Sequence, residues 1–341
     1  MTPTVELEPL RIVVYKVSGE MSELDLDQSS KVLDVKIHLA DVWGVPPVCQ
    51  QLIIGTEGLC DADPLSDYCA CDKVVPRLTM LVSLEVLSSE LHHADYERRE
   101  NALITLADLG VQGGALARSE VDLRLQDLHS RVRRAALYAL PKIALRGDQR
   151  AIESLLPLLV DRVVDVRCDA WRALATLAPT NDASVLQAVR VSLEDHEFLV
   201  RNVALETLEH VSAKGDCMSL QLATECLGDR APQVRRAAIK VIAKVAEHGD
   251  ERTMRLLIGM IHQSNIGVRC AAMEALSVVA ERGDDRAVQA LCACLTDAQV
   301  RVRWVAAKAL AKVALDGDPH VQTVSGPQNN FMDVEEEGNR T

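Results

Sequence analysis

The sequence predicts a multidomain protein in which an α+β domain comes first, an all-α helical solenoid follows, and an acidic segment ends the chain. Three observations lead to this expectation. Apolar residues alternate in short runs up to about residue 85, they repeat with a helical period of 34 residues from there to 318, and almost no periodicity remains beyond it. We therefore expect an N-terminal extension over residues 1–9, an α+β domain over 10–84, a solenoid over 85–318 and a disordered acidic tail over 319–341.

The composition of the 341-residue chain narrows the classes of function. Hydrophobic residues make up 48% and aromatic residues only 3%, so the core must be aliphatic, which suits thin helical layers. The net charge of −13 argues against a nucleic-acid partner. No secretory signal or apolar run of about 18 residues is present, so we expect no membrane association. Ten scattered cysteines favour reduced thiols in a cytoplasmic protein, with the nucleus as an alternative location. We expect the chain to be a monomer.

The first part of the chain combines short extended runs with one amphipathic helix. An apolar run, a Ser18-Gly19 turn and a second alternating run predict two strands, and the helix that follows ends at Gly44. Two further short strands complete an order typical of a β-grasp. The segments are Arg11–Val17, a run through Leu24 and Leu26, a helix face of Val32, Val35, Lys36 and Leu39, and strands at Gln51–Ile54 and Leu78–Val82.

From Leu10 to about Leu84 the chain resembles ubiquitin, because three motifs occur at matching spacing. The resemblance implies a partner-binding patch of three apolar side chains on the sheet face, here Val17, Ile53 and Leu81. The residues support an exposed apolar position independently, since neighbours in a strand such as Leu52 and Ile53 point to opposite faces. The motifs are Gly44-Val45-Pro46-Pro47, Gln50-Gln51-Leu52-Ile53 and Leu65-Ser66-Asp67-Tyr68.

The chain also departs from ubiquitin at functional positions. Gln51 stands where the family has an arginine beside the patch, and Glu57 stands where it has its main chain-linking lysine. Lys36 matches a family lysine that is usually part-buried and structural. The terminal Gly-Gly needed for conjugation is missing, because the last strand continues through Ser83-Leu84-Glu85 into more helix. The resemblance therefore implies a built-in docking domain and not a conjugated modifier.

The middle of the chain repeats one helical unit six times. A Val-Arg dipeptide recurs every 34 residues, and the residues 4, 8 and 11 positions after each valine lie on one stripe of a helix, which we call helix B. Gly, or Asn181, then ends helix B, and an Asp caps the next helix, helix A. Neither helix can bury its apolar side alone, so the units must stack. The dipeptides are Val132-Arg133, Val166-Arg167, Val200-Arg201, Val234-Arg235, Val268-Arg269 and Val302-Arg303.

These units resemble short HEAT-like repeats, of the type also seen in phycobilin lyases. Tetratricopeptide and ankyrin repeats have similar periods, but their signatures are absent. The resemblance implies that an Asp closing helix A pairs with the arginines of helix B and joins neighbouring repeats; Gln263 is the one departure. A seventh, degenerate repeat with Arg98-Arg99 precedes the six. The aspartates are Asp127, Asp161, Asp195, Asp229 and Asp297.

The side of helix B that points away from its apolar stripe is expected to line the concave side of the solenoid. We call it the helix-B face. It carries mixed charge with a Tyr and a Trp, which suits peptide or protein recognition, although a merely solvated surface is the alternative. The candidate residues are Arg134, Tyr138, Arg172, Arg236, Lys240, Trp304 and Lys308.

These features favour a non-enzymatic adaptor without a cofactor. Its head would dock on a ubiquitin receptor or the proteasome, and its helix-B face would hold a client protein. Two alternatives remain: an enzyme of the bilin-lyase or di-iron hydroxylase type, and a pure scaffold with a vestigial head. Only His196-Glu197 offers the His-Glu pair that a di-iron site would repeat, and Cys60, Cys69 and Cys71 lack a fourth zinc ligand at suitable spacing.

Overall fold

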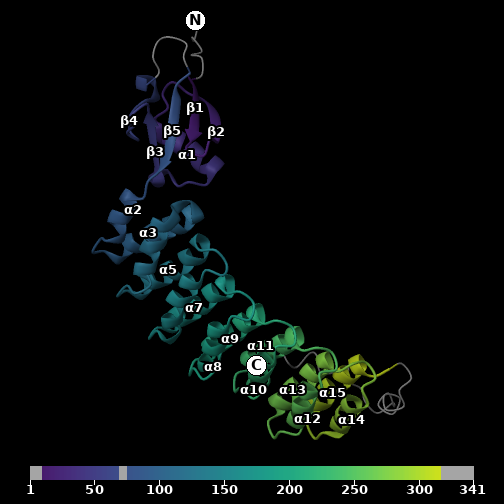
Figure 1. The fold of residues 1–341 in the computed structure, drawn as a ribbon. Coiled ribbons are helices and arrows are strands. Elements are labelled where there is room, and N and C mark those ends of the chain that lie inside the picture. Colours follow the sequence, from purple (N-terminus) through teal and green to yellow (C-terminus); the bar gives the residue numbers. More distant parts are fainter. Residues whose placement is uncertain (1–9, 69–74, 316–341) are drawn as a thin grey trace, which may run out of the picture. The chain divides into compact units, whose positions relative to one another are not determined.

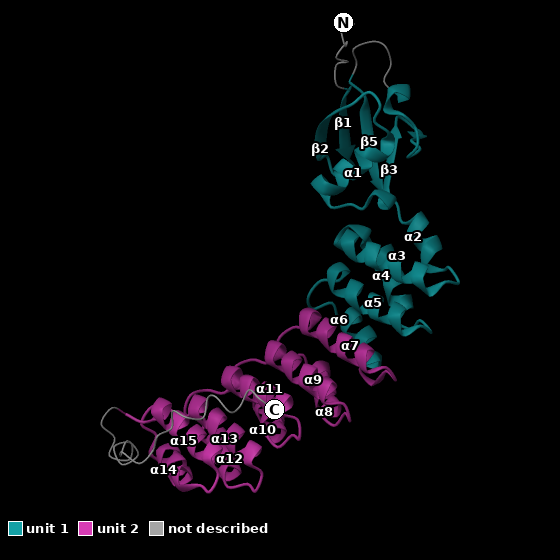
Figure 2. Cartoon of the chain, turned by 180° about the vertical axis from the view of Figure 1, so that it is seen from behind, with its two compact units in different colours: residues 1–158 teal, residues 159–341 magenta. Residues whose placement is uncertain are grey.

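The computed structural model describes residues 10–68 and 75–315. The predicted N-terminal extension over 1–9 and tail over 319–341 lie outside the described residues, as do Cys69 and Cys71. Contacts divide the chain into two compact units, residues 1–158 and residues 159–341 (Figure 2). The first unit holds the sheet and the first helices, and the second holds stacked helices only.

A five-stranded mixed sheet forms the N-terminal domain (Figure 1). Its order is β2-β1-β5-β3-β4, with β1 parallel to β5 and every other neighbouring pair antiparallel. The two-residue strand β4 was not predicted, because a strand this short shows no hydrophobic alternation. The strands are β1 (Leu10–Lys16), β2 (Met21–Leu26), β3 (Gln50–Ile54), β4 (Glu57–Gly58) and β5 (Arg77–Val82).

Helix α1 (Val32–Trp43) completes the core of this domain. It buries the predicted face of Val32, Val35, Lys36 and Leu39, and it ends at Gly44, whose φ of 66° is left-handed. The buried Gln50 side chain donates through Nε2 to the Lys36 and Val45 carbonyls, at 2.7 Å each. Lys36 is buried, and its Nζ lies 2.5 Å from Asp61. These polar contacts fix the helix against strand β3, so Lys36 has a structural role.

Helical repeats start immediately after strand β5. Helix α2 begins at Glu85, and α3 buries Ala102, Leu106 and Leu109, which lie 4, 8 and 11 positions after Arg98 as in the helix-B stripe. This helix pair lies where the sequence predicts the degenerate first repeat. The short helix η3 (Gly110–Gly113) follows, and the side-chain amide of its Gln112 donates to the Trp43 carbonyl at 3.1 Å. The helices of this unit are α2 (Glu85–Leu91), α3 (Tyr96–Leu109), α4 (Gly114–Arg124), α5 (Ser130–Ile143) and α6 (Gln149–Leu155).

The second unit continues the alternation of helix A and helix B. Its B helices start within two residues of each predicted Val-Arg, and all have 14 residues. Among the described residues no helix combines the length and apolar character that crossing a bilayer requires. The A helices are α8 (Ala183–Ser192), α10 (Cys217–Cys226), α12 (Glu251–Ile261) and α14 (Asp285–Ala293), and the B helices are α7 (Val164–Leu177), α9 (Phe198–Val211), α11 (Pro232–Val245), α13 (Ile266–Val279) and α15 (Val300–Val313).

The turn from helix B to the next helix A uses the predicted residues. Asn181, at φ 60°, takes the same left-handed conformation as the glycines that replace it in other repeats. The aspartate that follows accepts a hydrogen bond from the first-turn backbone and so caps helix A. These caps are Asp148, Asp182, Asp216, Asp250 and Asp284.

A ladder of arginines and aspartates joins neighbouring repeats, as the HEAT resemblance implies. Arg201 is bidentate on Asp229, with Nε–Oδ2 and Nη2–Oδ1 distances of 2.7 and 2.8 Å. Its Nη1 also donates to the Asp195 carbonyl of its own repeat at 2.7 Å. One guanidinium therefore holds two consecutive repeats. The ladder includes Arg99–Asp127, Arg167–Asp195, Arg201–Asp229 and Arg269–Asp297.

The ladder lacks a carboxylate at one joint of the second unit. Arg235 donates to the Asp229 and Arg230 carbonyls of its own repeat, but Gln263 stands where the next repeat would supply an aspartate. Asn265 takes over part of that role, because its side chain caps α13 by accepting from the Gly267 and Val268 N–H groups. The N-terminal N–H groups of α13 therefore have an acceptor, whereas Arg235 has no carboxylate at position 263 of the next repeat.

Restoring the carboxylate should strengthen this joint. We expect Gln263→Asp to raise the free energy of unfolding by about 1 kcal/mol, since it adds a charge-assisted hydrogen bond to Arg235 at a partly exposed position. Urea denaturation followed by circular dichroism measures the change. Gln263→Asn is the matched control, because it shortens the side chain without adding charge. Equal stability of the two variants would contradict the expected pairing.

Candidate protein-binding surfaces

The outer face of the sheet brings Ile53 and Leu81 together. Ile53 lies opposite Thr79 in the β3–β5 ladder, and Leu81 is two residues farther along β5 on the same face. Diagonal neighbours of this kind have Cβ atoms roughly 7–8 Å apart. Both side chains are half-buried, whereas their neighbours Leu52 and Met80 point into the core. Leu52 is thus the core member of the pair, and Ile53 is the half-buried member on the outer face.

Val17 follows strand β1 on the other side of β5 and is 77% exposed. Tyr15, two residues before it, lies opposite Thr79 in the parallel β1–β5 ladder. Tyr15 and Thr79 therefore lie between the three predicted patch residues, and sequence reasoning missed them. The signal was present, because Ile12 and Val14 are core residues and the alternation of a strand then places Tyr15 on the outer face.

The rim of this sheet face has mixed charge. Gln51 and Glu57 are exposed at the two departures from ubiquitin, and Arg77 is exposed on β5. Arg11 is paired with Asp25 across β1 and β2, at 3.0 Å between Nε and Oδ1. An apolar centre with this mixed edge can receive an apolar side chain, but Gln51 leaves it without an arginine at the position where ubiquitin has one beside the patch.

All seven predicted residues of the helix-B face are exposed. In the first unit Arg134 and Tyr138 lie one turn apart on α5, and Lys142 donates to the Tyr138 hydroxyl at 2.6 Å. In the second unit the others lie on separate helices. Arg172 of α7 pairs with Asp169, Arg236 and Lys240 share α11, and Trp304 and Lys308 share α15. The Lys308 Nζ lies 5.0 Å from the centre of the Trp304 ring.

Two positions in register with this face are not exposed. Cys168 and Cys270 occupy the same place in their repeats as Arg134 and Trp304, yet both are buried. A short side chain at the margin of the stripe is covered by its neighbours, whereas an arginine or tryptophan extends beyond them. The predicted face is therefore interrupted at α7 and α13.

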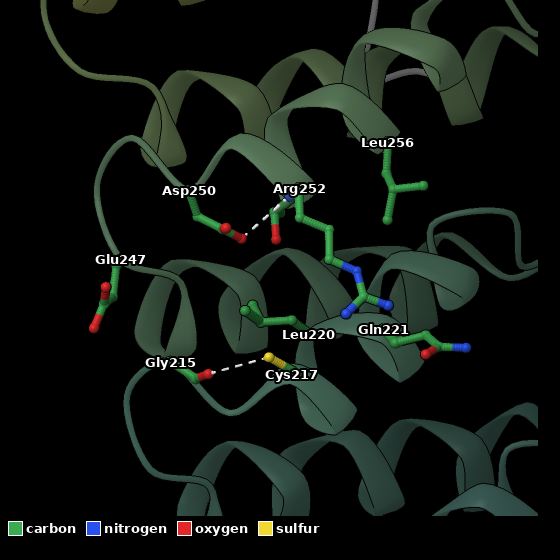
Figure 3. A pocket seen from close by; sticks show the side chains of 9 residues that line it. Gly215, Cys217, Leu220, Gln221, Glu247, Asp250, Arg252 and Leu256 are labelled. Atoms are coloured by element: carbon green, nitrogen blue, oxygen red, sulfur yellow. Dashed lines mark hydrogen bonds between the residues drawn. The ribbon is translucent and has the colours of Figure 1, made fainter.

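The structure also contains a pocket between the A helices α10 and α12 (Figure 3). Its volume is 260 Å³, and its lining combines the exposed thiol of Cys217 with Arg252, Gln221 and Glu247. Asp250 in this pocket is engaged in capping α12. Among the described residues no group of three His, Cys, Asp or Glu side chains could hold a metal ion.

The cysteine thiols in the described part of the chain differ in reactivity. Burial raises the pKa of Cys226 to about 12 and those of Cys49 and Cys294 to about 11. These three thiols are protonated at neutral pH and unreactive. Cys60 and Cys217 are exposed and are the accessible thiols.

This geometry defines a class of protein: a small sheet domain with an exposed apolar patch, followed by a helical-repeat solenoid. The family model for HEAT repeats matches residues 219–311. The ubiquitin-like protein NEDD8 of Dictyostelium discoideum is 33% identical over 57 residues, which cover 17% of this chain and 74% of that protein. The chain therefore belongs to the ubiquitin-like family through its N-terminal domain, and HEAT repeats follow that domain.

A solved structure resembles the chain more loosely. It is the crystal structure of an engineered protein from the Northeast Structural Genomics Consortium, with 22% sequence identity and a TM-score of 0.40. The similarity covers 67% of this chain and 68% of that one. At these values the likeness contributes nothing to the assignment of function.

Proposed function

We propose that this protein is a non-enzymatic adaptor whose β-grasp head docks on a ubiquitin receptor or the proteasome while the helix-B face holds a client protein. The observation that supports the head's role is the outer sheet face. It exposes Val17 and leaves Ile53 and Leu81 half-buried on either side of Thr79. Exposed apolar side chains that gather on one face are typical of a protein-interaction site.

The continuation of the chain supports docking and not conjugation. Strand β5 ends at Val82, and helix α2 begins at Glu85. No free Gly-Gly terminus exists at this point of the chain, so the head can present only its surfaces. The helix-B face then offers Tyr and Trp side chains beside basic groups, a combination common in binding hot spots. We propose a cytoplasmic location for this adaptor.

Replacing Ile53 tests the head. We expect Ile53→Ala to weaken binding of purified ubiquitin receptors by tenfold or more, because it removes the central apolar contact of the patch. Surface plasmon resonance of the full chain measures the affinities. Ile37→Ala is the matched control, since Ile37 is an exposed isoleucine on α1, away from the sheet's outer face. Circular dichroism verifies that both variants are folded.

Two results would contradict the adaptor. Unchanged receptor binding by Ile53→Ala would favour a scaffold with a vestigial head. Bound iron or a bound pigment, detected by metal analysis and absorbance of the purified protein, would favour a HEAT-like hydroxylase or lyase.

A further inference from the structure

Two B helices of the second unit carry an unusual excess of positive charge. Helices α11 and α15 each contain four Lys or Arg residues and no Asp or Glu. On the helix-B face this places Arg236, Lys240 and Lys244 on α11 and Trp304, Lys308 and Lys312 on α15. All six side chains are exposed. We call these six residues the basic strip.

Most cations of the basic strip lack a carboxylate partner. Among the described residues no Asp or Glu forms an ion pair with Arg236, Lys240, Lys308 or Lys312. Lys244 donates to the Glu209 carbonyl, which leaves its charge unneutralised. The acidic side chain of the intervening helix α13 on this face is Glu274, which is exposed. The strip is therefore two rows of free positive charge with one negative charge between them.

Helix α5 of the first unit shows that the basic residues of a B helix can be neutralised within the chain. It also has four basic residues and no acidic ones. There, however, Arg131 pairs with Glu100 at 3.0 Å, and Lys142 lies 3.8 Å from Asp108. The neighbouring helix thus supplies the carboxylates. At α11 and α15 the matching carboxylates must come from elsewhere.

The chain itself contains a suitable acidic segment. Residues 316–341 hold six Asp or Glu residues and one Arg, a net charge of −5. Four of the acids are Asp333, Glu335, Glu336 and Glu337, and the segment starts three residues after α15 ends. Asp333 is the eighteenth residue after Leu315, and a stretch of this length can span up to about 60 Å. Helix α11 lies two B helices away, roughly 20 Å at usual helix spacing, so the acidic cluster can reach both rows.

We propose that residues 316–341 are an intramolecular ligand of the basic strip and that they cover the helix-B face over α11, α13 and α15. The acidic cluster neutralises the two rows, and Lys312 lies beside the point where the segment leaves α15. This proposal rests on the proposed function only in its consequence: a client of this face must displace the segment. The head has no part in it.

Zero-length cross-linking of the full chain tests the contact. A carbodiimide joins a carboxylate to a lysine amine only when the two touch, so mass spectrometry should find residues 333–337 linked to Lys240, Lys244, Lys308 or Lys312. The links should disappear in 0.5 M salt, which screens exposed charges. Lys214 is the internal control, as an exposed lysine outside the strip.

Three results of this experiment would overturn the proposal: links to Lys214 at equal frequency, links that persist in salt, or no links to the strip at all. So would links between heavy and light chains in a mixture of isotope-labelled and unlabelled protein.

Competition by an added peptide provides the second measurement. A labelled synthetic peptide with the natural sequence of residues 316–341 is added to the full chain. It should bind at least tenfold more tightly to a full-length variant with Asp333→Asn, Glu335→Gln, Glu336→Gln and Glu337→Gln than to wild type, because the acidic cluster of that variant is neutralised. In that background Lys240→Glu with Lys308→Glu should abolish binding, and Arg252→Glu with Arg255→Glu on helix α12 should not. Equal binding with and without the neutralised segment would overturn the proposal, as would equal binding of a scrambled peptide, which would mark a general acidic-peptide site. Ile53→Ala should leave both measurements unchanged, so failure here is distinct from failure of the head to dock.

Discussion

Replacing Arg201 by Met should lower the free energy of unfolding by about 3–5 kcal/mol, because it leaves the Asp229 carboxylate buried without its partner. The side chains of Arg201 and Asp229 are only 8% and 13% exposed. The loss also removes the hydrogen bond to the Asp195 carbonyl, so both repeats lose a contact. Since each repeat is stabilised by its neighbours, we expect a melt in two steps in place of one. Differential scanning calorimetry of the full chain measures both quantities.

Two controls separate this effect from a general loss of charge. Arg172→Met removes an arginine whose side chain is 62% exposed and paired with Asp169, and it should cost no more than about 1 kcal/mol. The double variant Arg201→Met with Asp229→Leu should recover most of the stability, because no buried charge is left unpaired. A double variant as unstable as Arg201→Met would show that the ion pair is not the cause.

The same pair gives the stability a dependence on pH. Burial alone would raise the pKa of Asp229, but hydrogen bonds from Arg201 and the Ala231 N–H, together with the guanidinium charge, hold it below its ordinary value. A carboxylate with a lowered folded-state pKa stabilises the protein above its unfolded pKa of about 4, and this contribution is lost as the pH falls through the folded value. The stability difference between wild type and the double variant should therefore shrink below about pH 4.

Trp171→Ala should be comparably destabilising, at about 3–5 kcal/mol, because it empties the largest fully buried side-chain site in the described residues. Trp171→Phe should cost clearly less. The indole Nε1 of Trp171 is buried without a hydrogen-bond partner in the described part of the chain, so the phenyl ring gives up volume but breaks no hydrogen bond. Urea denaturation followed by circular dichroism compares the two variants. Equal losses would indicate that the indole N–H, and not the ring volume, matters at this site.

The sequence alone predicted the features of the solenoid that depend on local geometry. The turn at Gly147 and Asp148, which recurs from repeat to repeat, was predictable because a left-handed residue and a helix cap can be recognised from a few neighbouring positions. The arginine ladder was implied by the HEAT resemblance, and its residues recur in the same register. The helical period does not predict the burial of Cys168 and Cys270, because their register is that of the exposed Arg134 and Trp304. The compensation at Gln263 by Asn265 likewise needed coordinates, since the residues do not reveal which group caps α13.

The head shows the same division between local pattern and spatial arrangement. The helix face of α1 and the exposed position of Ile53 follow from periods of 3.6 and 2 residues. The neighbours Tyr15 and Thr79 became part of the patch only once the parallel β1–β5 register was known, because sequence order does not fix which strands pair. Neither the sequence pattern nor the fold identifies the binding partner, since a surface can be described without the protein that binds it.

The arginine ladder has a consequence for how such a chain can change length over evolution. Each rung uses one arginine to bind a carbonyl of its own repeat and an aspartate of the next, and the same two groups recur one period later. A duplication or deletion of 34 residues therefore regenerates an identical rung at the new junction, wherever between two complete rungs the event falls. Lengthening this array by whole repeats keeps every arginine in register with an aspartate, whereas an insertion that shifts a helix out of register would separate an arginine from its aspartate. The joint at Gln263 is the place where a copied segment would inherit a missing link.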